Sequence, residues 1–222
     1  MKKIAVIILF LNSLLIFAQE ESSDNENFKL FIGGGVLFTN EYEINKYLNL
    51  NNIQPITPVQ INANAGIIFY NKNVDIDLGY ELFASGKSND KTKNRTLSNG
   101  VKFRAHYVFT IAKDLEIGTG FNISYGKRKL IISYKDYNLD FNNLPLESIG
   151  NQITLFIEKA YLGPSVCLKI KNTGRNNQQT KITFSYEMPI NNKSWNSDFL
   201  NLQNKINEKK NKQFVINVSF AL

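Results

Sequence analysis

The sequence predicts an all-β protein, an eight-stranded antiparallel up-and-down transmembrane β-barrel with four long external loops. Three observations support this prediction. Eight segments alternate apolar and polar residues with a period of two, the pattern of a strand with two unlike faces. The connections between them alternate in length, as in barrels with short periplasmic turns and longer external loops. An apolar N-terminal segment follows two lysines, which is typical of an exported protein.

The N-terminus has the composition of a secretory signal peptide. Lys2 and Lys3 precede an apolar stretch that ends at Phe17, and Ala18 suits a cleavage site. No later segment contains an apolar run of ~20 residues, the length that a transmembrane helix needs. We therefore expect a signal peptide over residues 1–18, a flexible tail over 19–27 and a barrel over 28–222.

Most of the eight segments have the ~9 to 11 residues with which a tilted strand crosses a bilayer. Residues 197–210 have apolar positions at helical spacing, so we expect a short helix over the barrel mouth. The apolar and aromatic residues of 130–141 indicate that two strands continue beyond the membrane. The expected strands are 28–38, 59–70, 74–85, 97–112, 115–126, 158–171, 180–190 and 213–222. The expected long loops are 39–58, 86–96, 127–157 and 191–212.

Glycine indicates which face of the strands points inward. Glycines recur on the polar face, where a solvated exterior would give no reason to collect them. The lumen of an eight-stranded barrel does give one, because it is only just wide enough for its side chains. Aromatic residues near the strand ends of the apolar face match the girdles of membrane barrels. The apolar face is therefore expected to contact lipid. The glycines are Gly33, Gly35, Gly66, Gly79, Gly118, Gly120 and Gly163.

Charged residues of both signs are expected in the lumen. Opposed charges recover part of the desolvation cost that an unpaired charge would carry in a tight interior. We expect a network of ion pairs that plugs the barrel; the alternative is a narrow channel for small solutes or ions. The predicted network consists of Lys29, Asp75, Asp77, Glu81, Lys102, Arg104, His106, Glu116, Lys169, Lys181 and Glu187.

The sequence offers little catalytic or metal-binding chemistry. His106 is the only histidine and Cys167 the only cysteine, so no metal site, cofactor or intramolecular disulfide is expected. A serine hydrolase would need its histidine beside an accessible hydroxyl, whereas His106 faces the lumen, so we predict that the protein is not an enzyme. A lipid-modifying enzyme and a soluble ligand-binding barrel are the remaining alternatives. The net charge of +7 could suit nucleic acid, but export argues against it.

The expected external loops are rich in basic residues. Such residues beside an outer leaflet could bind lipopolysaccharide phosphates, or they could merely keep the loops soluble. A protruding sheet edge could also bind an envelope protein by strand addition. The candidate residues for contact with lipopolysaccharide are Lys87, Lys91, Lys93, Arg95, Lys127, Arg128 and Lys129.

The signal peptide, the alternating strands and the terminal segment FVINVSFAL together resemble small outer-membrane β-barrel proteins, with an architecture like that of OmpA and OmpX barrels. The segments FAQ and FIGGGVLF and the richness in Asn and Lys look more like the PorT-type outer-membrane β-barrel family of Bacteroidota. This resemblance implies the outer membrane of a Gram-negative bacterium and a fold, more than an activity. It also implies recognition by the barrel-insertion machinery, although the chain ends in Leu222 and its last aromatic residue is Phe220.

Overall fold

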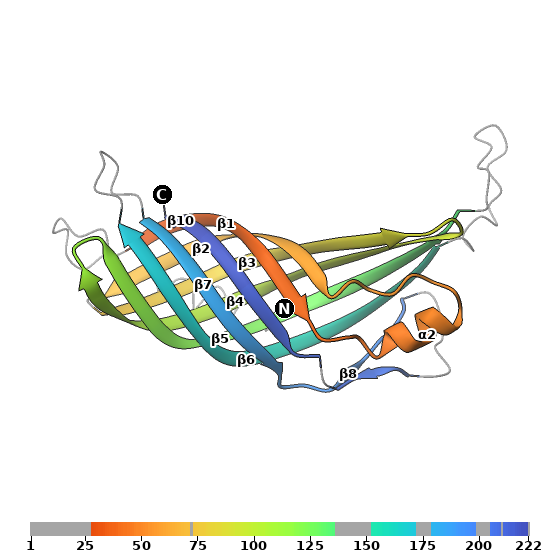
Figure 1. Ribbon diagram of the computed structural model, residues 1–222. Coiled ribbons are helices and arrows are strands. Elements are labelled where there is room, and N and C mark those ends of the chain that lie inside the picture. Colours follow the sequence, from red (N-terminus) through yellow and green to blue (C-terminus); the bar gives the residue numbers. More distant parts are fainter. Residues whose placement is uncertain are drawn as a thin grey trace.

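The computed structural model describes residues 28–71, 73–135, 152–171, 179–198, 205–209 and 211–221, so the expected signal peptide, the tail and Leu222 lie outside the described residues. Eight antiparallel strands close into a barrel in the order β1-β10-β7-β6-β5-β4-β3-β2 (Figure 1). The predicted all-β fold class, an eight-stranded antiparallel up-and-down barrel, is confirmed, but the four long external loops are not. The barrel strands are β1 (Phe28–Thr39), β2 (Val59–Asn71), β3 (Val74–Ser88), β4 (Thr92–Ala112), β5 (Leu115–Tyr134), β6 (Gln152–Lys171), β7 (Gln179–Pro189) and β10 (Gln213–Ala221). The other elements are the helix α2 (Ile44–Leu50) and a small sheet of β8 (Lys193–Ser194) and β9 (Asn207–Glu208).

The outer wall of the barrel is apolar and its interior is charged. On β3, Tyr80 and Leu82 are 46% and 52% exposed, whereas Asp77 and Glu81 on the opposite face are each 3% exposed. A soluble protein shows the reverse distribution, because exposed apolar side chains and buried charges are both unfavourable in water. The barrel therefore requires lipid around it, and a soluble ligand-binding barrel does not fit the structure.

Inward-facing glycines allow the lumen to be filled by larger side chains from nearby strands. Phe31 of β1 reaches across to Gly66 of β2 and Gly79 of β3. A Cβ atom on Gly66 would lie 2.8 Å from Phe31 Cε1, and one on Gly79 would lie 2.9 Å from Phe31 Cζ. Both distances are shorter than contacts between carbon atoms allow. The glycines thus make room for an aromatic ring inside the barrel.

Gly120 of β5 is expected to tolerate no side chain. A Cβ atom there would lie 1.8 Å from the carbonyl oxygen of Ala105 on β4. We expect Gly120→Ala to destabilise the barrel by at least ~1–3 kcal/mol, because the two strands must separate. Loss of the heat-modifiable band on an electrophoresis gel would report this. Gly86→Ala is the control, since its nearest atom would be 3.1 Å away; an unchanged band for Gly120→Ala would contradict the packing.

Four strands continue beyond the rest of the barrel as a sheet extension (Figure 1). The pairing of β3 with β4 runs without interruption to Ser88 and Lys93, and that of β5 with β6 to Ser133 and Gln152. The prediction of a long loop over 86–96 is therefore wrong: only residues 89–91 connect β3 to β4. The inward positions of this part of β4 are Thr and Asn rather than apolar residues, which removes the apolar alternation from the sequence. The expected continuation of β5 is present as far as Tyr134.

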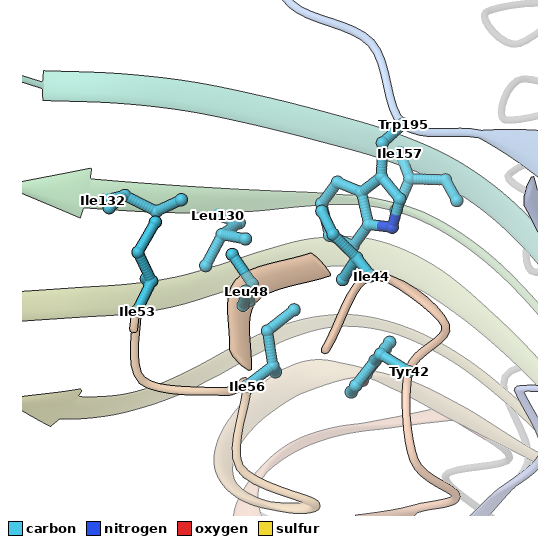
Figure 2. Packing of buried hydrophobic residues seen from close by; sticks show 9 residues of the cluster. All are labelled: Tyr42, Ile44, Leu48, Ile53, Ile56, Leu130, Ile132, Ile157 and Trp195. Atoms are coloured by element: carbon cyan, nitrogen blue, oxygen red, sulfur yellow. The ribbon is translucent and has the colours of Figure 1, made fainter. Parts of the chain in front are cut away.

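The inner face of the extension is covered by the loops that follow β1 and β7. Figure 2 shows α2 and its flanking residues packed with Trp195 against β5 and β6. We call these loop segments, residues 40–58 and the described parts of 190–212, the cap. Among the described residues, no helix is long and apolar enough to cross a membrane. The buried residues of the cap core are Tyr42, Ile44, Leu48, Ile53, Ile56, Leu130, Ile132, Ile157 and Trp195.

The helix predicted at 197–210 is absent from the described part of that segment, residues 197–198 and 205–209. Residues 207 and 208 form β9, which pairs with β8, and the Trp195 amide donates to the Ile206 carbonyl. Residues 199–204 and 210 lie outside the described residues. Pairing with β8 gives this segment backbone partners that an isolated short helix would lack at its ends. The helix of the cap is α2 instead, in the loop between β1 and β2.

Candidate functional site: the closed lumen and the outer basic face

The upper lumen contains ion pairs around Lys102. Its Nζ atom lies 2.8 Å from a Glu81 oxygen and 2.9 Å from a Glu187 oxygen. Arg104 contacts the other Glu81 oxygen at 2.7 Å and an Asp77 oxygen at 3.8 Å. The five side chains are at most 4% exposed. Each cation is thus shared between two carboxylates.

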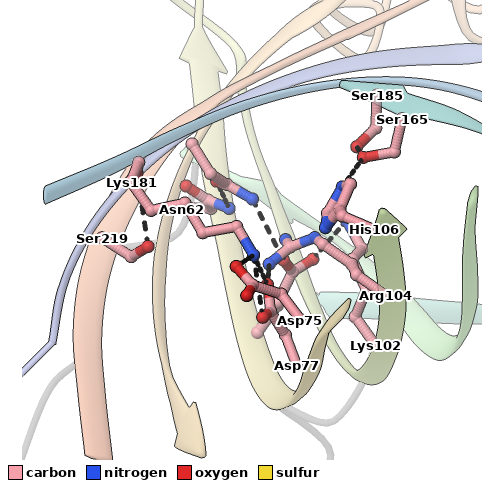
Figure 3. A network of polar contacts seen from close by, with 12 residues as sticks. Asn62, Asp75, Asp77, Lys102, Arg104, His106, Ser165, Lys181, Ser185 and Ser219 are labelled. Carbon is pink, nitrogen blue, oxygen red and sulfur yellow. Dashed lines mark hydrogen bonds and ion pairs between the residues drawn. The ribbon is translucent and has the colours of Figure 1, made fainter. Parts of the chain in front are cut away.

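The lower lumen continues the alternation of charges (Figure 3). Lys181 Nζ lies 2.9 Å from Asp77 and 3.5 Å from Asp75, which in turn is 2.9 Å from Lys169 Nζ. Lys169 also pairs with Glu116 at 3.0 Å, and Glu116 pairs with Lys171 at the periplasmic end. The resulting chain of alternating acids and bases follows the lumen from Glu187 to Lys171.

These ion pairs cross the barrel rather than only linking neighbouring strands. Lys181 is on β7 and its partners Asp75 and Asp77 are on β3, and these two strands lie on opposite sides of the closed barrel. Lys102 of β4 reaches Glu187 of β7, three strands away. Side chains that meet across the full width of the lumen leave little space for solute. The charges therefore also connect the opposite walls.

An apolar layer lies beside the chain of charges. Phe31, Ile68 and Ala221 are buried together, and Tyr70 packs against them. They come from β1, β2 and β10. In the sheet Ile68 is paired with Asp77 and Tyr70 with Asp75, so the apolar layer adjoins the charged residues within the lumen.

Three residues add detail to the predicted network. Lys29 lies half-buried on β1 and is paired with Ile68 in the sheet. His106 is buried and is paired with Asp75 in the sheet, and its Nε2 atom lies 2.8 Å from Ser165 Oγ. Lys171 was not predicted, because it ends its strand and is 47% exposed, but it completes the chain at Glu116. The remaining predicted residues meet in the lumen as described above.

Glu208, which was not among the residues predicted from the sequence, connects the segments of the cap through hydrogen bonds. Its carboxylate accepts the backbone amides of Glu43 and Ile44 at the start of α2, at 2.9 and 3.0 Å. It also accepts Trp195 Nε1 at 2.9 Å. One buried carboxylate therefore satisfies the free amides of α2 and the indole of the cap core. No spacing rule in the sequence points to a residue 164 positions from its partner.

Lys159 lies at the junction of barrel and cap, and its pKa is shifted from the ordinary value of a lysine. Its ammonium donates to the Glu208 backbone carbonyl at 2.5 Å. The pKa of Lys159 is lowered to about 8, mainly by burial; the negative charge of Glu208 opposes this shift, and the positive charge of Arg128 contributes to it. An unfolded lysine titrates near 10.5, so between these two values the unfolded state binds more protons than the folded state.

The stability of the cap is therefore expected to rise as the pH increases from about 8 toward 10.5. We expect at most ~2 kcal/mol, after allowance for solvent screening. Trp195 is the only tryptophan, so its fluorescence during denaturant titration measures cap unfolding. Lys159→Met should remove the rise; a rise of equal size in both proteins would assign it to other groups.

The basic residues predicted for the loops lie mostly on strands. Lys87 is on β3, Lys93 and Arg95 are on β4, and only Lys91 lies in a connection. Lys127, Arg128 and Lys129 belong to β5, so their placement in a loop was wrong. Arg128 faces inward and is buried, because inward and outward positions alternate along a strand.

The outward-facing bases form a patch directly above the lipid-facing wall. Lys129 is paired with Leu97 in the sheet, and Lys127 with Asn99. Arg95 and Lys93 follow on the same face of β4. We call these four residues, Lys93, Arg95, Lys127 and Lys129, the outer basic patch. The acid beside it is Glu158, which pairs with Lys127 in the sheet and accepts the Tyr125 hydroxyl at 2.9 Å.

Hydroxyl and imidazole groups meet only inside the lumen among the described residues. Ser165 lies between His106 and Ser185, whose Oγ is 3.3 Å away. All three side chains are buried below the cap. The described residues contain no group of three or more His, Cys, Asp or Glu side chains that could hold a metal ion. Cys167 is buried beside Gly118.

No family model and no curated protein matches this sequence. Among solved structures, Neisserial surface protein A matches with a TM-score of 0.53 at 10% identity, over 89% of this chain and 97% of that one. Ail of Yersinia pestis matches with a TM-score of 0.46 at 12% identity, over 88% and 97%. The outer membrane protease OmpT of Escherichia coli matches with a TM-score of 0.38 at 10% identity, over 91% and 98%.

These matches change two expectations. The matched structures include an outer-membrane protease, so the prediction that the protein is not an enzyme is corrected: its fold does not decide the question. None of the matches supports the more specific resemblance to the PorT-type family of Bacteroidota. What they share with this chain is the fold. With its apolar outer wall and charged lumen, the protein is an outer-membrane β-barrel of a Gram-negative bacterium.

Proposed function

We propose that the protein is an outer-membrane barrel with a plugged lumen that binds lipopolysaccharide on its outer face. The observation that carries this proposal is a groove of about 430 Å³ beside the outer basic patch. It lies where β2 begins and where β3 and β4 continue beyond β2 into the sheet extension. A ligand in this groove would touch both the lipid-facing wall and the sheet extension.

The groove combines two kinds of surface. Its apolar side includes Ile61 and Leu97, which are 67% and 46% exposed and continue the lipid-facing wall. Its basic side includes Lys87, Lys93 and Arg95. Acyl chains suit the first surface, and a phosphate group suits the second, because guanidinium groups bind phosphate through paired hydrogen bonds. This pairing of surfaces favours a phosphorylated amphiphile over a soluble anion.

Removal of the positive charges of this region is the direct test. A basic residue near an anionic membrane surface contributes ~1 kcal/mol. Replacing Lys93, Arg95 and Lys129 by Gln together is therefore expected to weaken binding of lipopolysaccharide roughly 100-fold. Binding can be measured by titrating lipopolysaccharide into the protein in a neutral detergent.

A matched control removes three exposed lysines from the cap. Lys46, Lys193 and Lys209 are exposed and lie away from the groove. Their replacement by Gln lowers the net charge equally and should leave the affinity unchanged. Equal losses in both variants would reduce the effect to overall charge and overturn the proposal. Unchanged lipopolysaccharide binding with lost capture of an envelope protein would assign the patch to a protein partner instead.

The second candidate function is a narrow channel, which one feature of the lumen favours. Asn122 is fully buried, and neither its amide nitrogen nor its amide oxygen has a hydrogen-bond partner among the described residues. The amide nitrogen and the amide oxygen of Asn64 also lack a hydrogen-bond partner among the described residues. Buried amides are normally satisfied, so these positions suit internal water. A connected file of such water would conduct ions, whereas isolated waters would not.

A further inference from the structure

A small cavity lies beside the ion pair of Glu81 with Lys102 and is lined by residues of β3, β4, β5, β6 and β10. Its volume is about 50 Å³, several times the ~10–15 Å³ that one water molecule needs. Gly100 and Gly126 form one side of it and are paired across β4 and β5. A Cβ atom on Gly100 would lie 2.5 Å from the Tyr125 carbonyl oxygen. The close approach of these strands thus demands glycine, and the missing side chains leave the space open.

Two buried cations line this cavity. Arg128 is 7% exposed and Lys159 is 4% exposed. Arg128 donates from Nε to Ser98 Oγ at 2.9 Å, and its guanidinium carbon lies 5.1 Å from the ring of Tyr42. Lys159 donates to a backbone carbonyl. All of these partners are neutral, and none of the ion pairs among the described residues includes either cation.

The carboxylates closest to these cations are already occupied. Glu208 accepts the two amides of α2 and the indole of Trp195. Glu81 and Glu187 pair with Lys102 below. Arg128 and Lys159 therefore face the cavity together with Glu81, whose carboxylate is already shared by Lys102 and Arg104. The lowered pKa of Lys159 agrees with a positive charge that lacks a full counter-charge.

We infer that this cavity binds a small free oxyanion, such as inorganic phosphate or sulfate, between Arg128 and Lys159. A buried cation without a counter-charge is unfavourable, and an oxyanion would supply that charge together with acceptors for the remaining N–H groups. The lining includes Glu81 from the lumen and also Val101 and Tyr125, which face outward, so a free oxyanion and the phosphate of a lipid headgroup share the chemistry that the cavity recognises. The lipopolysaccharide arm of the experiment below distinguishes the two sources. The anion would also join the cap to the barrel, because Arg128 contacts the ring of Tyr42 and Lys159 donates to the Glu208 carbonyl, and both of these partners belong to the cap. This inference is independent of lipopolysaccharide binding at the outer face.

Anion binding in the cavity is measured through the unfolding of the cap, which the fluorescence of Trp195 follows. The wild-type protein in neutral detergent is titrated with sodium phosphate, with sodium sulfate and, in a separate arm, with lipopolysaccharide, each at constant ionic strength. We expect phosphate or sulfate to raise the cap's unfolding temperature with saturation. Arg128→Gln and Lys159→Gln should each raise the dissociation constant at least tenfold, while Arg128→Lys, which keeps the charge, should retain part of the binding.

Lys113→Gln is the control, because Lys113 is exposed in the connection between β4 and β5 and lines neither the cavity nor the groove beside the outer basic patch. It should bind phosphate as the wild type does. Heat-modifiability on a gel verifies that each variant has a folded barrel. An equal loss in Lys113→Gln, no saturable effect in the wild type, or protection by lipopolysaccharide alone would each overturn the inference.

Discussion

Lys102→Met is expected to destabilise the barrel by ~3–5 kcal/mol. The ammonium group of Lys102 is the shared partner of Glu81 and Glu187, and both carboxylates are almost fully buried. Methionine fills a similar volume but leaves these carboxylates facing each other without the cation. Equilibrium unfolding in denaturant, in detergent or lipid vesicles, measures the loss.

Two further variants isolate the electrostatic cause. Lys46→Met removes an exposed ion pair with Glu43 on the cap and should leave stability unchanged. Adding Glu187→Gln to Lys102→Met removes the carboxylate whose only ion-pair partner in the described part of the protein is Lys102, so part of the lost stability should return. If Lys102→Met unfolds at the wild-type denaturant concentration, the chain of ion pairs does not hold the barrel closed.

Trp195→Ala is expected to release the cap while the barrel stays folded. The indole is fully buried in the cap core, and truncation of a buried tryptophan costs ~3–5 kcal/mol. The indole N–H also donates to Glu208, so the alanine variant leaves that carboxylate with one partner fewer. Limited trypsin digestion should cleave at the lysines of the cap much faster than in the wild type, whereas the heat-modifiable barrel should remain.

Trp195→Phe separates packing from hydrogen bonding. Phenylalanine keeps most of the apolar volume but cannot donate to Glu208, so its cap should open less readily than that of the alanine variant. Cap cleavage at the wild-type rate in Trp195→Ala would show that the cap core does not hold these loops together.

The barrel wall was predictable because its physical rules act locally. Alternation in VDIDLGYEL placed Asp75, Asp77 and Glu81 on one face, and the width of an eight-stranded lumen made glycine the signal for the inward direction. Strand ends were less predictable. Thr92, Asn94 and Thr96 point inward on the extension, where the polar atoms of Asn94 bond to the loop at Gln54 and Pro55. Because these inward residues are polar, the segment lacks the apolar alternation that identifies a strand. The cap, which is distant in sequence, stabilises this strand.

The cap and the cavity depend on contacts that sequence spacing does not contain. Glu208 meets α2 across 164 residues, and Lys159 meets the Glu208 carbonyl across 49. Arg128 lies between two lysines in the sequence, which made all three look like one exposed loop cluster. In the structure the strand alternation turns Lys127 and Lys129 outward and Arg128 inward, so one run of bases serves two different surfaces.

Single-channel conductance of the purified protein in a planar lipid bilayer tests most directly whether the lumen is closed. With the apolar layer at Phe31 and the ion pairs that cross from β3 to β7 in place, the wild type should show no sustained current steps. Reproducible steps from the wild type, with an ion selectivity that changes in Lys102→Met, would contradict the closed lumen and identify the protein as a channel.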